Sequence, residues 1–284
     1  MDSVQLIECP RDALQGFKHW VPTNKKITYA QALLEVGFDV LDVGSFVSPK
    51  VIPQMKDTAE VLNGLDRSKS LTELLVIVAN LRGVEEACAN PQVDWIGYPF
   101  SISENFQMRN THKTIADSLS LLDQIILRCN SNGKKLVVYL SMGFGNPYGD
   151  PWSPTIVGDW MEILAEKGIK IISLSDTIGS ASDVNIQKLF SKLIPLYPEL
   201  TIGAHLHCLK QDAINKLSVA YNAGCRRFDG AIMGFGGCPM AKDELVGNMP
   251  TELILSFLNM RKIPNSLHPI KFESAYNQCL KTFI

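Results

Sequence analysis

The chain has 284 residues, 46% of them hydrophobic and 20% charged, which is enough to bury one large core or two smaller ones. Its formal net charge of −2, without a long lysine or arginine run, excludes the electrostatic footprint of a protein that binds nucleic acid or an anionic membrane surface. No apolar run approaches the roughly 20 residues of a membrane-spanning helix.

The cysteines and the first residues point to a reducing compartment. The seven cysteines form no Cys-x-x-Cys pair, and their odd number fits free thiols better than a disulfide framework. The chain starts directly with a strand-like segment and lacks the basic and apolar regions of a secretion signal. We therefore expect a cytoplasmic protein.

Short β-branched runs alternate with longer amphipathic stretches along the chain. We expect strands at residues 4–9, 40–44, 74–78, 94–98, 135–141, 169–174, 201–207 and 227–232. We expect helices at residues 28–36, 53–62, 84–89, 113–129, 154–167, 184–194, 211–222 and 251–259. This repeat predicts an α/β protein with a (β/α)8 TIM barrel. The alternative is an open doubly wound sheet, which prefers fewer strands and a Gly-x-Gly-x-x-Gly turn that this sequence lacks.

No linker or break in composition divides the sequence. We therefore expect a single TIM-barrel domain over residues 1–284, with a C-terminal helical extension after Met260. Because active sites of such barrels lie at the carboxyl ends of the strands, the residues that follow each strand are the candidates for function.

Polar residues of several kinds follow the expected strands. They are Arg11 and Asp12 after the first, Asp42 in the second, Asp176 after the sixth, His205 and His207 in the seventh, and Cys238, Asn248 and Glu252 after the eighth. Each also has a structural interpretation. Arg11 and Asp12 could form a local ion pair, either aspartate at a strand end could cap a helix, and Cys238 could be an incidental thiol.

The His205-Leu-His207 segment is the most informative of these features. Residues two apart on a strand point to the same side, so both imidazoles leave the strand end together. Two hydrogen-bonded structural histidines would give the same pattern. With Asp12 and a carboxamide such as Asn248, however, they form a mixed oxygen and nitrogen shell that suits Mg²⁺ or Mn²⁺, with Fe²⁺ or Co²⁺ as alternatives.

Such a site suggests carbon–carbon bond cleavage or formation. A bound cation would lower the pKa of a substrate hydroxyl, and Arg11 would stabilise the negative charge of an oxyanion or enolate. Cys238 lies in a glycine-rich segment and could act as an acid or base over the substrate.

Five segments in the same order along the chain resemble the landmarks of hydroxymethylglutaryl-CoA lyases, which are metal-dependent lyase/synthase barrels. They are Pro10–Gln15, Gly44–Lys50 with Pro53–Met55, Ser175–Gly179, His205–His207 and Gly236–Ala241. The resemblance extends from about Val4 to Leu258. It implies cleavage of 3-hydroxy-3-methylglutaryl-CoA, or a close 3-hydroxyacyl-CoA, to acetyl-CoA and acetoacetate, as in leucine degradation.

The resemblance also implies roles for individual residues. Asp12, His205, His207 and Asn248 would bind one Mg²⁺ or Mn²⁺ ion. The catalytic residues would be Arg11, Asp42, Asp176, Cys238 and Glu252. The resemblance also suggests a homodimer. Gln15, Lys18, Ser45 and Lys50 are the candidate contacts of the small-molecule acyl-CoA substrate, although Lys18 and Lys50 could equally be solvated surface lysines. From its charge and composition we expect the protein to bind neither nucleic acid nor membrane.

The sequence departs from the family pattern at three places. Asp42 replaces the usual glutamate, the segment 208–211 is altered, and the segment 242–247 is longer and more acidic. Two alternatives stay open. One is a synthase that condenses an acyl-CoA with a 2-oxo acid. The other, motivated by Asp42 and the altered segment after His207, is a barrel that binds a CoA ester without turning it over.

Overall fold

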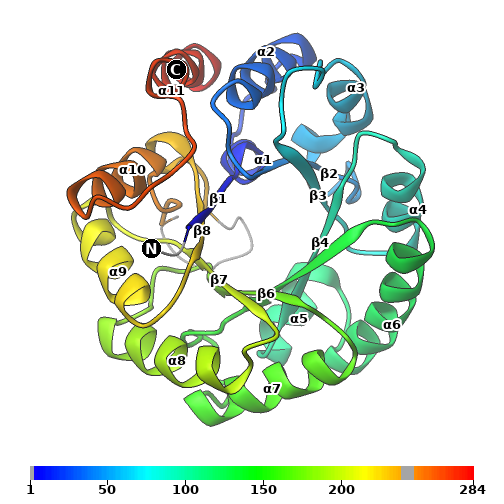
Figure 1. Ribbon diagram of the computed structural model, residues 1–284. Coiled ribbons are helices and arrows are strands. Elements are labelled where there is room, and N and C mark those ends of the chain that lie inside the picture. The colour runs from blue at the N-terminus through cyan, green and yellow to red at the C-terminus, as the bar shows by residue number, and fades with distance from the viewer. Residues whose placement is uncertain (1–2, 238–245) are drawn as a thin grey trace.

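The computed structural model describes residues 3–237 and 246–284. Within these ranges, eight parallel strands close into a barrel in chain order, and helices surround it (Figure 1). The strands are β1 (Gln5–Glu8), β2 (Val40–Ser45), β3 (Glu73–Ile77), β4 (Trp95–Ser101), β5 (Lys135–Ser141), β6 (Ile171–Asp176), β7 (Thr201–Leu206) and β8 (Arg227–Gly230). The expected TIM barrel is confirmed.

Most of the helices that follow the strands form the outer layer. The helices of the described ranges are α1 (Pro10–Gln15), α2 (Thr23–Leu34), η1 (Pro53–Met55), α3 (Thr58–Asn63), α4 (Leu81–Ala89), α5 (Glu104–Thr111), α6 (Ile115–Ser131), α7 (Pro154–Glu166), α8 (Asp183–Leu196), α9 (Lys210–Asn222), η2 (Ile232–Gly234), α10 (Thr251–Met260) and α11 (Pro269–Phe283). The expected C-terminal helix is α11.

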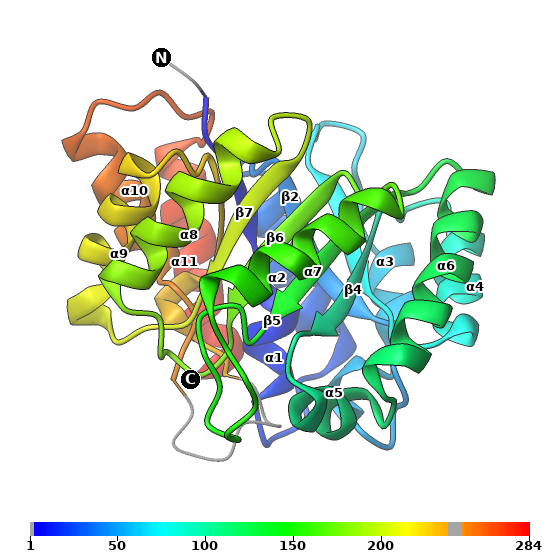
Figure 2. The ribbon, with the colours of Figure 1, turned by 90° about the horizontal axis from the view of Figure 1, so that it is seen from below.

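The short helices differ from the sequence prediction. The stretch 53–62, expected as one helix, is divided into η1 and α3. The residue before α3, Asp57, has a non-helical ψ of 15°, and its carboxylate accepts from Thr23 and Lys26 of α2 instead of capping α3. Helices α1 and α5 were not expected. Each has fewer than nine residues, which is too short to produce a clear helical period. Both lie at one end of the barrel, opposite the N-terminus (Figure 2).

The barrel interior is divided between apolar and charged residues. One group of buried apolar side chains comes from the first five strands and includes Ile7, Leu75 and Tyr139. On the side of β8, Arg227 and Asp229 are buried and paired with each other. The apolar half stabilises the closed sheet, and the charged half lies beneath the histidines at the end of β7.

Helix α11 packs on the outer layer next to α2 (Figure 1). The ring of Phe283 at its end lies 5.8 Å from Tyr29, 5.6 Å from Phe17 and 5.0 Å from Phe235, measured between centroids. The C-terminal helix therefore supports the segments that follow α1 and β8. Among the helices of the described ranges, we find none with the length and apolar character to cross a membrane.

Candidate active site

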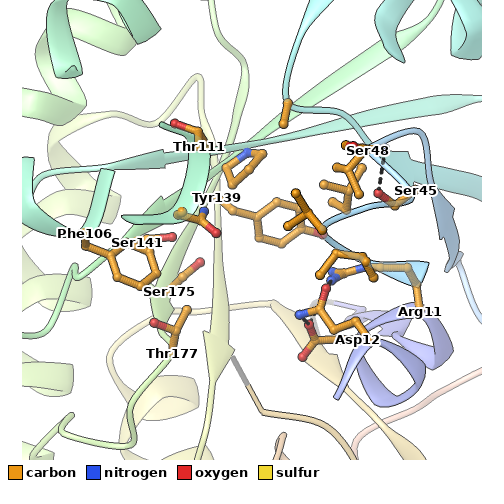
Figure 3. A pocket seen from close by; sticks show the side chains of 18 of the residues that line it. Arg11, Asp12, Ser45, Ser48, Phe106, Thr111, Tyr139, Ser141, Ser175 and Thr177 are labelled. Atoms are coloured by element: carbon orange, nitrogen blue, oxygen red, sulfur yellow. Dashed lines mark hydrogen bonds and ion pairs between the residues drawn. The ribbon is translucent and has the colours of Figure 1, made fainter. Parts of the chain in front are cut away.

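A cavity of about 260 Å³ opens at the carboxyl ends of the strands. Arg11 and Asp12 lie on one side of it, and Ser141, Ser175 and Thr177 lie on the other (Figure 3). The rings of Phe106 and Tyr139 and several aliphatic side chains give it a largely apolar wall. Such a cavity suits a small ligand with a few polar groups.

The predicted metal ligands meet at the edge of this cavity. Ligand atoms of Asp12, His205 and His207 all lie within 4.8 Å of one another, and all three residues are buried. The two Nε2 atoms are 3.4 Å apart, and Nε2 of His207 is 3.6 Å from Oδ2 of Asp12. Residues from β7 and from α1 therefore face a common point.

Asn248 lies against the same group. Its segment forms an antiparallel bridge with His207, and its Nδ2 donates to Oδ2 of Asp12 at 2.6 Å and to the carbonyl of Phe235 at 2.9 Å. Gly236 passes so close that a Cβ atom there would overlap Nδ2, and its φ of 115° is one that favours glycine. The amide oxygen, Oδ1, accepts no hydrogen bond from the described residues.

The hydrogen bonds of His207 identify the atom that it presents to the cluster. Its Nδ1 lies 2.8 Å from the carbonyl oxygen of Val246, which can only accept a hydrogen bond. Nδ1 therefore carries the proton, and Nε2 of the neutral ring presents a lone pair towards Asp12 and His205. A carboxylate oxygen and imidazole lone pairs that converge in this way fit a divalent cation.

The charges around Asp12 keep it ionised. Burial opposes its ionisation, but its neighbours, Arg11 first among them, outweigh that effect and lower the pKa of Asp12 to about 2. Burial also lowers the pKa of His207, which favours the neutral ring that a metal requires. Asp12 therefore offers an anionic oxygen beside the neutral imidazole of His207, whereas Asp229 outweighs burial and raises the pKa of His205.

Arg11 is held rigidly by its neighbours. Its Nη2 is 2.6 Å and its Nε 3.0 Å from Oδ2 of Asp42, and its Nη1 donates to Asp12 and to Gln15, each at 2.8 Å. Burial would lower the pKa of Arg11, but Asp42 and Asp12 raise it. Asp42 lies next to a register shift between β2 and β3, and such irregularities often redirect a side chain near an active site.

The other predicted catalytic residues lie further from the cavity. Asp176 accepts hydrogen bonds from the backbone N–H groups of Ser180 and Ala181 at 3.0 and 2.7 Å, so its carboxylate shapes the turn after β6. Glu252 accepts from the N–H of Met233 at 3.0 Å. Neither residue lines the cavity. Cys238 lies outside the described residues.

Some of the predicted substrate contacts lie in the cavity wall and others do not. Gln15 and Ser45 line the cavity, whereas Lys18 and Lys50 are exposed and lie outside its lining. The sequence did not predict the part of the cavity wall formed by residues 110–113 or by Tyr139. A signal was present for the first of these, because Ser103 caps α5 by accepting from the N–H of Phe106.

Comparison with known proteins agrees with this geometry. The HMGL-like family model matches residues 4–278. A hydroxymethylglutaryl-CoA lyase from Bacillus subtilis is 33% identical over 266 residues, which cover 94% of this chain and 88% of that protein. A cytoplasmic 3-hydroxy-3-methylglutaryl-CoA lyase from Rattus norvegicus is 32% identical over 90% of this chain and 74% of its own length.

Solved structures give the same result. A crystal structure of the Bacillus subtilis HMG-CoA lyase superposes with a TM-score of 0.92 at 31% identity, covering 100% of this chain and 94% of that one. An HMG-CoA lyase from Acinetobacter baumannii, in complex with coenzyme A and 3-methylmalate, superposes with a TM-score of 0.91 at 29% identity, covering 99% and 91%. The chain therefore belongs to the HMGL-like family.

Proposed function

We propose that this protein is a divalent-metal-dependent carbon–carbon lyase that cleaves 3-hydroxy-3-methylglutaryl-CoA, or a close 3-hydroxyacyl-CoA, to acetyl-CoA and acetoacetate. The observation that carries the proposal is the convergence of Asp12, His205 and His207 beside Arg11 at one cavity. The relatives described above are HMG-CoA lyases, which supports the same reaction.

Asp12, His205, His207 and Asn248 would hold one Mg²⁺ or Mn²⁺ ion. When bound, such a cation lowers the pKa of a substrate hydroxyl and stabilises negative charge on oxygen. Asn248 would contribute Oδ1, the atom without a hydrogen bond from the described residues. Since Asp12 and both histidines are buried, little water competes for these positions.

Arg11 would bind the thioester carbonyl oxygen and stabilise the charge that develops on it. A guanidinium has five N–H groups. Asp42, Asp12 and Gln15 accept from Nε, from one N–H of Nη2 and from both N–H groups of Nη1. One N–H on Nη2 is left for a substrate oxygen, and the surrounding contacts fix its direction before the substrate binds.

Asp42 would act through Arg11. It is fully buried, does not line the cavity, and directs both of its oxygens to the guanidinium. Asp176 and Glu252 would hold the turns after β6 and β8 in place. We propose Cys238 as an acid or base of the reaction on the resemblance alone; Cys238→Ser should then lower kcat strongly without loss of the fold.

The cavity fits the acyl end of the substrate better than the whole molecule. Its volume of about 260 Å³ is below the ~300–1,000 Å³ of pockets that enclose a drug-sized ligand. Ser45 and Ser141 on its wall offer hydroxyl groups to a carboxylate. The nucleotide of coenzyme A would then lie over the mouth, where Lys18 and Lys50 could reach its phosphates.

The test is a turnover assay on the whole chain after removal of metals by a chelator. Release of acetyl-CoA and acetoacetate from hydroxymethylglutaryl-CoA only after addition of Mg²⁺ or Mn²⁺ is the expected result. Condensation of acetyl-CoA with a 2-oxo acid would instead identify a synthase. Tight binding of the thioester with neither reaction would identify a CoA-ester-binding barrel.

The assembly and the compartment stay predictions. We propose a homodimer, which light scattering of the purified chain would test against a mass of about twice 31.4 kDa. We also propose a cytoplasmic location, which fractionation of cells would test. A monomer, or recovery in another compartment, would contradict these two statements without affecting the reaction.

A further inference from the structure

A buried ion pair lies beneath the two histidines, inside the barrel. Arg227 and Asp229 on β8 are 1% and 3% exposed, and Nη1 of Arg227 is 2.9 Å from Oδ1 of Asp229. Burial of two charges costs several kcal/mol of solvation, and apolar residues of similar volume often replace such a pair without loss of stability. The pair therefore calls for an explanation other than stability.

The strand register places Asp229 beside His205. The two residues are direct partners in the parallel pairing of β7 with β8, so their side chains lie on the same face of the sheet. Oδ2 of Asp229 is 3.2 Å from Nδ1 of His205. Arg227 is two residues earlier on β8 and points to the same face, where it binds the other oxygen of Asp229.

Gly203 makes room for the arginine. It lies on β7, two residues before His205. A Cβ atom at this position would lie 3.0 Å from Nη1, 3.1 Å from Cδ and 3.2 Å from Cγ of Arg227. These separations are shorter than ordinary van der Waals contact. Strand β7 therefore has a glycine at the position where the side chain of Arg227 packs against it.

We propose that Gly203, Arg227 and Asp229 form a positioning device that keeps the proton of His205 on Nδ1, so that the lone pair of Nε2 faces Asp12. The inference rests on the proposed metal-dependent function. Arg227 binds Oδ1 of Asp229, which leaves Oδ2 to accept the Nδ1–H of His205. His207 has a separate partner for its own Nδ1, the carbonyl of Val246.

The same residues allow a competing interpretation. Ligand atoms of Cys9, His205 and Asp229 also lie within 4.8 Å of one another, so they could themselves hold a cation. Both oxygens of Asp229 already have partners, because Oδ1 pairs with Nη1 of Arg227 at 2.9 Å and Oδ2 lies 3.2 Å from Nδ1 of His205. Nδ1 of His205, which faces Asp229, therefore carries a proton, and Nε2 is free to bind a metal.

The experiment compares Asp229→Asn with the wild type by two measurements on the full chain. The first is the tautomer of His205 in metal-free protein, observed by NMR of ¹⁵N-labelled histidine. The second is the affinity for Mn²⁺. In the variant, Arg227 still needs an acceptor and takes the amide oxygen, so the amide NH₂ faces Nδ1 of His205. We expect the proton to move to Nε2 and the Mn²⁺ affinity to fall by roughly 10–100-fold.

The double variant Arg227→Met/Asp229→Asn distinguishes positioning from general damage. Without the arginine, the amide oxygen is free to accept from Nδ1 of His205. We expect the Nδ1–H tautomer to return and the Mn²⁺ affinity to recover most of its loss. A double variant as weak as Asp229→Asn, or an Asp229→Asn protein with the wild-type tautomer and affinity, would overturn the proposal.

Two further variants complete the test. Cys9→Ser should keep the wild-type Mn²⁺ stoichiometry and affinity, whereas loss of a bound equivalent would favour the inner cation site and overturn the assignment. If Asp229→Asn does not fold, Gly203→Ala should displace Arg227 and weaken Mn²⁺ binding about tenfold; an unchanged affinity would count against the device. Absence of lyase activity with normal Mn²⁺ binding would contradict only the proposed reaction.

Discussion

Arg11 and Asp42 form a two-point ion pair across α1 and β2. Asp42 is fully buried, and its Oδ2 accepts from Nη2 at 2.6 Å and from Nε at 3.0 Å. Burial raises the pKa of Asp42 even though Arg11 opposes this effect, so the carboxylate depends on its partner for its charge. The guanidinium in turn depends on Asp42 for its direction.

Asp42→Asn should therefore lower kcat more than it affects KM. One amide oxygen cannot accept both N–H groups in the same geometry, and Arg11 would turn away from the thioester carbonyl. A displacement of about 1 Å at an active site can reduce the rate roughly 100-fold. Steady-state kinetics with hydroxymethylglutaryl-CoA would measure it, with Asp39→Asn, directly before the first residue of β2, as the control. Normal turnover of Asp42→Asn would show that the pair does not position Arg11.

Metal content separates the members of the cluster from other residues of the cavity. His207→Ala removes a proposed ligand and Asp12→Asn removes the negative charge of another, so the affinity for Mn²⁺ should fall at least about tenfold in each. Elemental analysis after dialysis against Mn²⁺ would measure the occupancy. His112→Ala is the matched control, since His112 lines the same cavity outside the cluster. Full occupancy in His207→Ala would remove this residue from the metal site.

The sequence carried enough information to predict the barrel and to bring Asp12, His205 and His207 together. Side chains two apart on a strand share a face, and carboxyl strand ends meet at one end of a parallel barrel. Neither rule needs exact element boundaries. The strand boundaries were wrong by one to three residues at most ends without changing which residues meet at the cavity.

Asp229 shows what the sequence could not reveal. In the segment Arg-Phe-Asp-Gly it follows an arginine by two residues, as a surface pair also would. Its proposed role depends on the register between β7 and β8, which sets His205 opposite it. The wall at residues 110–113 was missed for another reason. It lies at the end of α5, a helix too short to be detected from periodicity.

Phe283 links the C-terminal helix to two segments of the active site. Phe283→Ala removes contacts with Phe17, Tyr29 and Phe235 and should lower the free energy of unfolding by roughly 3 kcal/mol. Ile270→Ala on the same helix is the control. Ile270 is 69% exposed, so this change should cost less than about 0.5 kcal/mol. Urea unfolding would measure both, and equal losses would contradict a specific role for the Phe283 ring.

The proposed contacts of Lys18 and Lys50 with coenzyme A can be tested with two substrates, one with the nucleotide and one without it. If their charges bind the phosphates of coenzyme A, then Lys18→Ala or Lys50→Ala should raise KM several-fold for the CoA thioester and leave kcat unchanged. A pantetheine thioester lacks the nucleotide and should show the same KM with wild type and variants. A similar rise in KM for both substrates would indicate that these exposed lysines affect the local structure at the mouth of the cavity.

Glu8 is the buried acid whose ionisation should make stability depend on pH. It accepts hydrogen bonds from Thr251 at 2.6 Å and from the N–H of Ile232 at 2.8 Å. Burial nevertheless outweighs these contacts and raises its pKa from 4.5 to about 8. Between these two values the folded protein holds a proton that the unfolded chain has released. Folding is therefore favoured at low pH within this window.

The contribution of Glu8 is fully present below about pH 4.5 and is lost as the pH rises through about 8. Between these two pH values, the contribution of Glu8 to the free energy of unfolding should decrease by about 1.4 kcal/mol per pH unit. Glu8→Gln has the same shape and no proton to release, so its unfolding free energy should lack this decline and exceed that of the wild type at pH 8. Urea unfolding at several pH values would measure it, with exposed Glu60→Gln as the control. Parallel pH profiles for wild type and Glu8→Gln would mean that Glu8 stays ionised in the folded protein, with Thr251 and Ile232 offsetting its burial.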